Sequence, residues 1–274
     1  MIIIGEKING AIPSVKQAIA EKNEALILER TLAQAKAGAD FLDCAPSTAT
    51  EVEYDTMVWL MDLMQSCTDV PLCIDSPNAA LLARILEEGH AKKCGMVNSV
   101  NEEGNKCETI FPLIAGTGWE VVGLTCDRDG IPADPVKKVE IAKRIIDKAD
   151  KYGVALNQLH IDPCVMALAT MPSAMEDFVY CIEKIHAYAP TVKVTGAISN
   201  ISFEMPARKY VNMNCMAYAM DAGLDSAIMD PCSQDMMGTI SACEALRMTD
   251  KGGRKYNRAY RKGLFGQAKP AVTA

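Results

Sequence analysis

The sequence carries little of what a nucleic-acid-binding protein or a membrane protein needs. Its formal net charge is −7, and the one basic run is the stretch 251–262, where six of twelve residues are Lys or Arg. A nucleic-acid-binding protein would show a broader basic surface. There is no run of about 18 apolar residues and no secretory signal. We therefore expect a cytoplasmic protein that contacts neither nucleic acid nor a membrane.

Paired cysteines and clustered histidines, the usual marks of disulfide and zinc sites, are also missing. The eleven cysteines are odd in number and form no Cys-x-x-Cys, and the three histidines are scattered as His90, His160 and His186. Cysteines in this pattern are typical of reduced cytoplasmic thiols that serve as small apolar side chains. We predict no metal site.

The sequence further lacks an interdomain linker and a dinucleotide-binding motif. No stretch rich in Pro, Gly or Ser divides the 274 residues, so we predict one domain over residues 1–250. The basic residues 251–274 would follow as a solvated tail, with a docking surface as the alternative. No Gly-x-Gly-x-x-Gly follows the first apolar run, which argues against a dinucleotide site.

What the sequence does have is an alternation of short apolar runs with amphipathic stretches. The runs are continuous, as in parallel strands buried on both faces; they are Ile2–Ile4, Phe41–Leu42, Leu72–Ile74, Met96–Val97, Val121–Leu124, Leu159–Ile161, Val192–Ile198 and Ala227–Met229. The stretches have helical spacing of apolar residues; they are Glu24–Lys36, Glu51–Gln65, Asn78–Glu88, Lys106–Ala115, Pro135–Lys151, Ser173–Tyr188, Tyr210–Asp221 and Ser233–Arg247. Eight such pairs predict an α/β fold, the (β/α)8 TIM barrel. An open doubly wound sheet is the alternative.

Polar side chains follow the apolar runs at nearly every predicted strand end. They are Glu6, Asn9, Asp43, Asp75, Asn98, Asp127, Asp162, Asn200 and Asp230. Each of them alone could cap the helix that follows, since Asp and Asn are preferred N-caps. As a set they would converge, because all strand C-termini of a TIM barrel meet at the face where active sites form.

The chemistry of such a mouth would be that of a hydrogen-bond acceptor. Carboxylates and amides with few cations disfavour phosphate, which needs Arg, Lys or a Gly-rich loop. They suit a neutral ring with several N–H donors, such as a 2-amino-4-oxopyrimidine, whose carbonyl can accept from an Asn amide. A divalent metal held by the carboxylates is the alternative.

Several of these strand ends resemble the motifs of pterin-binding methyltransferases. The matching segments are Gly5-Glu6-Lys7-Ile8-Asn9, Asp43, Cys73-Ile74-Asp75-Ser76, Met96-Val97-Asn98-Ser99, Gly123-Leu124-Thr125, Gly130-Ile131-Pro132, Ile161-Asp162-Pro163 and Gly196-Ala197-Ile198-Ser199-Asn200-Ile201-Ser202. They occur in order and at matching spacing as far as about Arg247. The sequence most resembles the methyltransferases that act between methyltetrahydrofolate and a corrinoid protein.

The resemblance implies a pterin-binding TIM barrel that takes tetrahydrofolate as a substrate. Asp75, Asn98 and Asp162 would hold the edge of the pterin. Asn200 would be the catalytic residue, facing the N5 atom where the methyl group sits, and Arg208 would lie on the same loop. The other substrate-binding positions would be Glu6, Asn9, Asp43, Gly196 and Ser199.

The resemblance also implies that a second protein supplies the cobalt. Corrinoid modules of this class need an Asp-x-His-x-x-Gly segment, and no histidine of this chain has that context. Methylcobalamin would therefore arrive on a partner corrinoid protein. We expect the enzyme itself to be a homodimer.

The favoured function is methyl transfer from methyl-Co(III) of the corrinoid protein to N5 of tetrahydrofolate, in a demethylation pathway. This direction is suggested by Phe203-Glu204-Met205-Pro206, which replaces a more polar stretch of the branch that serves a corrinoid iron–sulfur protein. The alternatives are transfer from methyltetrahydrofolate to such an iron–sulfur protein, an enzyme like dihydropteroate synthase, and a non-catalytic folate-binding protein. A dihydropteroate synthase would need a Ser-Arg-Lys-type segment where this chain has Ser199-Asn200-Ile201.

Overall fold

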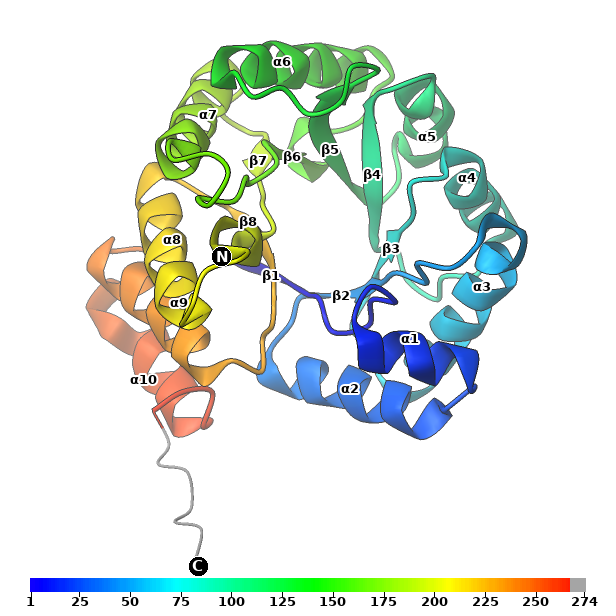
Figure 1. The fold of residues 1–274 in the computed structure, drawn as a ribbon, viewed down its shortest axis with the longest axis horizontal. Coiled ribbons are helices and arrows are strands. Elements are labelled where there is room, and N and C mark those ends of the chain that lie inside the picture. Colours follow the sequence, from blue (N-terminus) through cyan, green and yellow to red (C-terminus); the bar gives the residue numbers. More distant parts are fainter. Residues whose placement is uncertain (267–274) are drawn as a thin grey trace, which may run out of the picture.

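A computed structural model describes residues 1–266 of the chain, and its strands form a ring surrounded by helices (Figure 1). The strands are β1 (Ile2–Gly5), β2 (Phe41–Cys44), β3 (Leu72–Asp75), β4 (Met96–Glu102), β5 (Glu120–Asp127), β6 (Leu159–Asp162), β7 (Lys193–Val194) and β8 (Ser226–Met229). The α-helices are α1 (Pro13–Ala20), α2 (Glu24–Ala37), α3 (Thr50–Cys67), α4 (Ala79–Glu88), α5 (Lys106–Ile114), α6 (Pro135–Lys151), α7 (Ala174–Tyr188), α8 (Arg208–Ala222), α9 (Gln234–Leu246) and α10 (Arg254–Arg261).

The sheet closes on itself as a parallel barrel. Each strand pairs in parallel with its sequence neighbour from β1 to β7, and β8 pairs with β1. The remaining seam, between β7 and β8, is joined by a parallel bridge between Ala197 and Ile228. There the N–H of Ile228 donates to the carbonyl of Gly196 at 3.0 Å. The (β/α)8 TIM-barrel prediction is confirmed.

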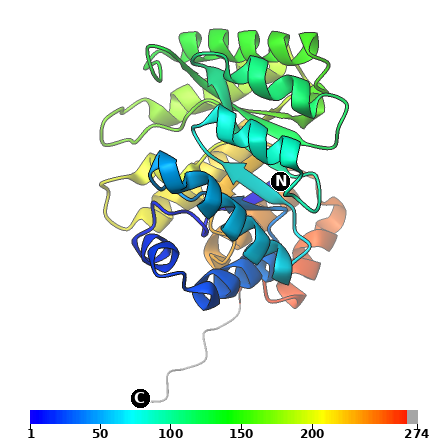
Figure 2. The ribbon, with the colours of Figure 1, turned by 90° about the vertical axis from the view of Figure 1, so that its right-hand side faces the viewer.

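Alternating strand residues serve two cores. Inward-facing side chains form a small cluster in the barrel, made of Ile4, Phe41, Cys73, Met96 and Val122. Their neighbours along the strands point outward into the larger core beneath the helices, which run along the outside of the barrel (Figure 2). This alternation brings Asp43, two residues after Phe41, and Asp75, two residues after Cys73, to the inner wall near the mouth.

The helices begin and end much as the sequence signals indicate. Pro135 opens α6, where Asp134 accepts a hydrogen bond from the N–H of Val136 at 2.9 Å. Gly38 ends α2 with φ at 96°, a left-handed conformation that costs glycine little. Helix α1 was not predicted. No helix among residues 1–266 is long and apolar enough to cross a membrane.

The basic segment after residue 250 forms helical structure over its described part. It forms a 3-10 turn, Lys251–Gly253, and then α10, which packs against α9. Phe265 is only 5% exposed and contacts the rings of Tyr256 and Tyr260, with centroids 4.9 and 6.1 Å away. Arginines and lysines of α10 stay exposed. The division into a domain over residues 1–250 and a basic tail over 251–274 stays a prediction, and residues 267–274 lie outside the described part.

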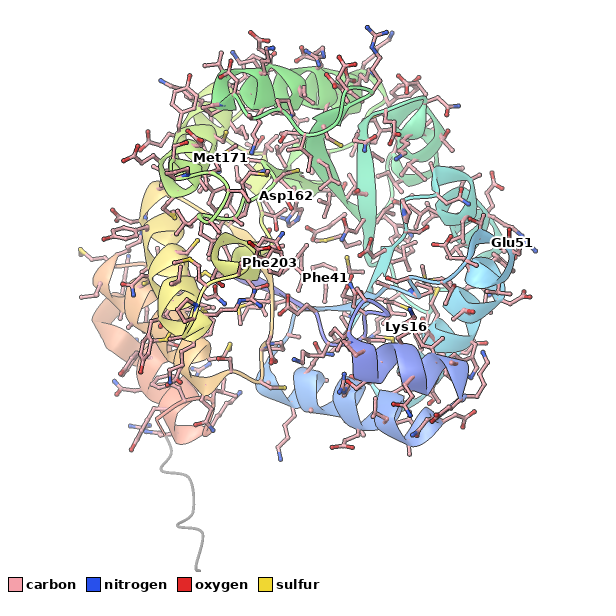
Figure 3. All side chains as sticks on the ribbon, viewed as in Figure 1. Lys16, Phe41, Glu51, Asp162, Met171 and Phe203 are labelled. Atoms are coloured by element: carbon pink, nitrogen blue, oxygen red, sulfur yellow. The ribbon has the colours of Figure 1, made fainter. Side chains whose placement is uncertain are left out.

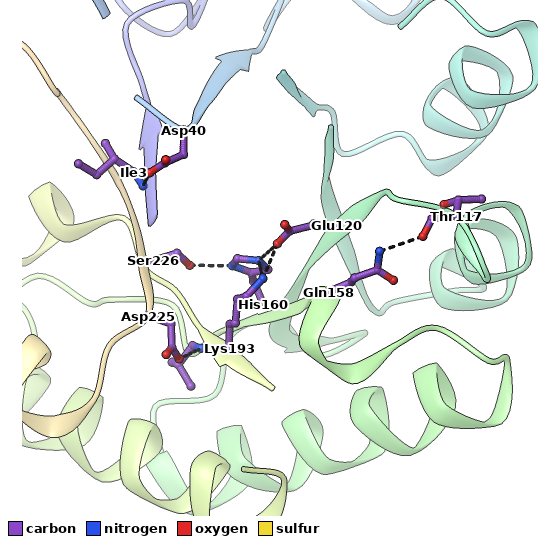
Figure 4. Close-up of polar contacts among 10 residues, drawn as sticks. Ile3, Asp40, Thr117, Glu120, Gln158, His160, Lys193, Asp225 and Ser226 are labelled. Carbon is purple, nitrogen blue, oxygen red and sulfur yellow. Dashed lines mark hydrogen bonds and ion pairs between the residues drawn. The ribbon is translucent and has the colours of Figure 1, made fainter. Parts of the chain in front are cut away.

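A polar cluster fills the barrel at the end away from the mouth (Figure 4). His160 is fully buried, and its ring nitrogens contact Ser226 Oγ (2.7 Å) and the carboxylate of Glu120. Lys193 Nζ donates to the same carboxylate at 2.7 Å. Burial lowers the pKa of His160, which keeps the ring neutral. Polar groups at this end of a TIM barrel serve stability rather than chemistry.

Candidate functional site at the barrel mouth

A cavity of about 720 Å³ opens at the C-terminal ends of the strands. Most of the predicted site residues line it, namely Glu6, Asn9, Asp43, Asp75, Asn98, Ser199, Asn200 and Arg208. They come from the ends of β1 to β4 and from the segment between β7 and α8. The barrel therefore brings together residues that are up to about two hundred positions apart in the sequence.

Asp43 forms the most deeply buried part of the cavity floor. Its side chain is 2% exposed, and Asn9 Nδ2 lies 3.4 Å from one carboxyl oxygen, Oδ2. The other oxygen, Oδ1, is buried and has no hydrogen-bond partner among the described residues. Burial raises the pKa of Asp43 well above its ordinary value, and the nearby carboxylate of Asp75 raises it further. The raised pKa favours the protonated form of the Asp43 carboxyl, and its Oδ1 is an unused polar atom at the cavity floor.

Asp75 is poised between its two protonation states. Burial and then the negative charge of Glu53 raise its pKa to about 7. Glu53 is itself held by Ser76, whose hydroxyl donates to Oε1 at 2.6 Å. A carboxyl with this pKa can accept hydrogen bonds when ionised and donate one when protonated.

Two predicted residues, Asp162 and Gly196, do not line the cavity as the described residues define it. Asp162 lies inside the ring of strands (Figure 3), and its Oδ1 accepts a hydrogen bond from the N–H of Cys164 at 2.7 Å. Burial raises the pKa of Asp162 to about 6. Gly196 packs against α7, because a Cβ added there would come within 2.8 Å of Phe178 Cζ. The ligand contacts predicted for these two residues stay predictions.

The segment between β7 and α8 is tied together by Arg208. Ser199 and Asn200 lie in a 3-10 helix, Ile198–Ser202. Arg208 Nη2 donates to the Ser199 carbonyl at 2.7 Å, and its Nε donates to Ser202 Oγ at 2.9 Å. The guanidinium also lies over the ring of Phe203, 4.8 Å from the centroid. These contacts fix the turn that carries Asn200 at the cavity wall.

Two cations at one edge of the cavity could not be predicted from the strand-end pattern. Lys7 and Lys209 line it together with Arg208, so the expectation of a mouth poor in cations is wrong at this edge. Lys7 Nζ lies 3.1 Å from Asp230 Oδ2, and Lys209 Nζ lies 2.8 Å from Asp235 Oδ2. Asn212 and Phe203 also line the cavity. Only Lys7 had a sequence signal, since it follows Glu6 directly.

The described residues do not provide a set of side chains arranged to bind a metal ion. Over residues 1–266 there is no group of three or more His, Cys, Asp or Glu side chains that could hold a metal ion. The negative charge of Asp75 raises the pKa of Asp43, and that of Glu53 raises the pKa of Asp75, as neighbouring carboxyls do when no cation lies between them. Hydrogen bonding to N–H groups is the chemistry that this floor can offer.

The chain belongs to the pterin-binding enzyme family. The model of that family, described as pterin binding enzyme, matches residues 11–230, which contain most of the barrel. The fold agrees: the chain superposes on Xanthomonas albilineans dihydropteroate synthase in complex with 7,8-dihydropteroate with a TM-score of 0.66 and 17% identity. That superposition covers 90% of this chain and 92% of the synthase.

Within the family, the chain is similar to a protein named methylcorrinoid:tetrahydrofolate methyltransferase, from Eubacterium limosum. The two are 48% identical over 268 residues, which covers 97% of this chain and 98% of the relative. Methionine synthase of Mycobacterium tuberculosis is 31% identical over 242 residues, or 84% of this chain and 20% of the synthase. The chain thus spans only about a fifth of that larger protein.

Proposed function

We propose that this protein is a methyltransferase that moves a methyl group between the cobalt of a separate corrinoid protein and N5 of tetrahydrofolate. The observation that carries the proposal is the mouth cavity, where an acceptor floor and Asn200 line one space. The near full-length similarity to a methylcorrinoid:tetrahydrofolate methyltransferase supports the same reaction. Tetrahydrofolate is then a substrate, and the methylcorrinoid arrives on its own protein.

The floor of the cavity binds the pterin. The 2-amino group and ring N–H groups of the pterin donate to Asp75 and Asp162, and the Asn98 amide N–H donates to the carbonyl of the pterin ring. Asp43 supports this set from below, with Asn9 holding one of its oxygens. Glu6 completes the wall; burial raises its pKa, while Lys7 opposes that effect.

At N5, the reacting atom, the residues of this chain position the substrate and do not supply a proton. The N5 lone pair forms a bond to the methyl carbon as the Co–C bond breaks, which leaves both electrons on cobalt as Co(I). The proton on N5 then passes to water or to a cavity carboxylate. Asn200 can accept from N5–H or donate to its lone pair, but a neutral amide is no general acid. Its contribution is to hold N5 in line with the methyl group.

We assign the direction from methyl-Co(III) to tetrahydrofolate, as part of a demethylation pathway. The name of the Eubacterium limosum relative supports this order. Transfer from methyltetrahydrofolate to a corrinoid iron–sulfur protein is the reverse reaction in the same site. Measuring both initial rates, with each of the two corrinoid proteins as partner, separates the alternatives.

The dihydropteroate synthase alternative has less support from the segment after β7. A synthase would need a Ser-Arg-Lys-type segment there, whereas this chain has Ser199-Asn200-Ile201. The structural likeness to the synthases, at 17% identity, concerns the fold alone. A product assay with a pterin pyrophosphate and 4-aminobenzoate would detect this activity directly.

The protein is also proposed to act in the cytoplasm and as a homodimer. Its cysteines are all free thiols over the described residues, as expected in a reducing compartment. An apolar groove of about 400 Å³ between α7 and α8 includes Tyr210 and Tyr218, which are 62% and 63% exposed. Sedimentation of the wild type and of Tyr218→Glu tests the dimer: a monomeric wild type would contradict it.

The experiment that tests the methyl transfer uses purified protein, tetrahydrofolate and a methylated corrinoid. We expect methyltetrahydrofolate to form together with the spectrum of Co(I). Folate binding without any methyl transfer would leave a non-catalytic folate-binding protein, and absence of folate binding would contradict the pterin site itself.

A further inference from the structure

The charges that line the mouth cavity are separated into two poles. Buried acidic groups, Asp43 and Asp75, form the floor at the ends of β2 and β3. The cations Lys7, Arg208 and Lys209 line another part of the cavity, from the segment after β1 and the first turn of α8, and outnumber the one acidic lining residue beside them, Glu6. A ligand that spans this cavity therefore meets acceptors at one end and positive charge at the other.

The two lysines of this edge are accessible and loosely held. The side chain of Lys7 is 35% exposed and that of Lys209 is 57% exposed. Their partners Asp230 and Asp235 are 31% and 59% exposed. Ion pairs at such exposure contribute little to stability, so either lysine can turn to a ligand carboxylate at small cost.

The start of α8 adds to the positive potential. Its first turn holds Arg208 and Lys209 and no acidic residue, and Ala207 provides no side-chain cap. Cations are unfavourable beside a helix N-terminus, which already carries a partial positive charge. Three cations and an uncapped helix start therefore converge on one wall of the cavity, and an anionic ligand group would stabilise all of them.

A second hollow continues the cavity beyond this edge. It measures about 200 Å³ and shares Glu6, Ser199, Lys209 and Asn212 with the main cavity. Asn212 Oδ1 is buried there without a hydrogen-bond partner among the described residues. The hollow therefore offers an acceptor for an amide N–H next to a cation for a carboxylate.

We propose that Lys7 and Lys209 bind the carboxylates of the glutamate tail of folate, so that the protein prefers tetrahydrofolate with a polyglutamate tail over the monoglutamate. The inference rests on the proposed function, since it takes the pterin to occupy the acidic floor. Each γ-linked glutamate of the tail brings one amide N–H and one further carboxylate, the two groups that Asn212 and Lys209 complement.

The test compares the affinity of the wild type for tetrahydrofolate mono- and triglutamate by titration calorimetry. We expect the triglutamate to bind about two- to five-fold more tightly, the size of one or two exposed ion pairs. Lys209→Gln and Lys7→Gln should each weaken binding of the triglutamate more than binding of the monoglutamate, and so bring the ratio of the two affinities toward one. Lys36→Gln, an exposed cation in the last turn of α2 at the other end of the barrel, is the matched control and should keep the ratio.

Salt gives a second readout. The preference for the triglutamate should fall as ionic strength rises from about 0.05 to 0.5 M, because exposed charges are screened. Equal affinity for both folates in the wild type, or a preference that survives both lysine substitutions, would overturn the proposal while leaving the pterin site intact. Failure to bind either folate would instead contradict the proposed function.

Discussion

At the scale of the residue, the buried carboxyl of Asp75 is the group on which pterin binding most depends. It lies at the end of β3 on the inner wall, with burial and Glu53 raising its pKa to about 7. Asp75→Ala should weaken tetrahydrofolate binding by roughly 1.5–3 kcal/mol, the usual contribution of a hydrogen bond to a charged group. Calorimetry measures this, with the exposed Asp62→Ala on α3 as control. An unchanged affinity would show that the pterin does not sit on this floor.

The same carboxyl should make stability depend on pH. Its native pKa is raised to about 7 from 3.8, so the stabilising contribution is fully present below pH 3.8 and is lost as the pH rises through 7. Asp75→Asn cannot ionise. We expect the variant to melt at a higher temperature than the wild type at pH 8, with about 2–4 °C for each kcal/mol gained. The difference should shrink toward pH 5; a constant offset across this range would contradict the assignment.

Asn200 should affect turnover more than affinity. Its side chain lines the cavity on the short 3-10 helix that Arg208 holds in place. Asn200→Ala would remove the group that aligns N5, so we expect a loss in kcat of about ten-fold or more with a much smaller change in folate affinity. Equal losses in both quantities would mean that Asn200 only binds the substrate.

Some residues of the site could be predicted from the sequence because they directly follow apolar runs that form the barrel strands. Asp43 and Asp75 each follow a buried run, so their position at the mouth follows from the barrel alone. Lys209 could not be predicted in this way. It belongs to an amphipathic helix whose facing depends on how α8 packs beside α9, and the hydrogen bonds of the preceding loop decide where the helix begins.

At the scale of the element, the sequence indicated the barrel helices well and the two additional helices poorly. Continuous apolar runs and flanking caps located the strands and most helices within a few residues. Helix α1 has only eight residues, and α10 is so rich in cations that its pattern indicated a solvated segment. Both depend on tertiary contacts that local periodicity does not contain.

The contact between α10 and α9 makes the C-terminal segment part of the folded unit. Phe265 is 5% exposed and meets Tyr256, Tyr260 and the backbone of α9 near Gly238. Phe265→Ala should lower the free energy of unfolding by about 3–5 kcal/mol, as for other buried aromatic side chains. Denaturant unfolding measures it, with Leu32→Ala, an exposed apolar side chain on α2, as the comparison. An unchanged free energy of unfolding would contradict the packing of this segment against α9.

At the scale of the whole molecule, the two ends of the barrel divide stability from function. The end away from the mouth is filled by the hydrogen-bonded cluster of His160, Glu120 and Lys193. At Glu120 burial alone would raise the pKa, but the hydrogen bonds from His160 and Lys193 outweigh it and lower the pKa. At the mouth, by contrast, no cation lowers the pKa of the buried Asp43. Its Oδ1 atom also lacks a hydrogen-bond partner among the described residues. Such unsatisfied groups indicate where a ligand supplies the missing contacts.

The central claim is that this mouth transfers a methyl group between cobalt and N5 of a folate. The most direct measurement mixes the purified protein with tetrahydrofolate and a methylated corrinoid protein and follows methyltetrahydrofolate by chromatography and Co(I) by absorbance. We predict that both products form in equal amounts, and that Asn200→Ala slows their formation while folate still binds. Tetrahydrofolate that binds in the cavity but never becomes methylated would contradict the claim.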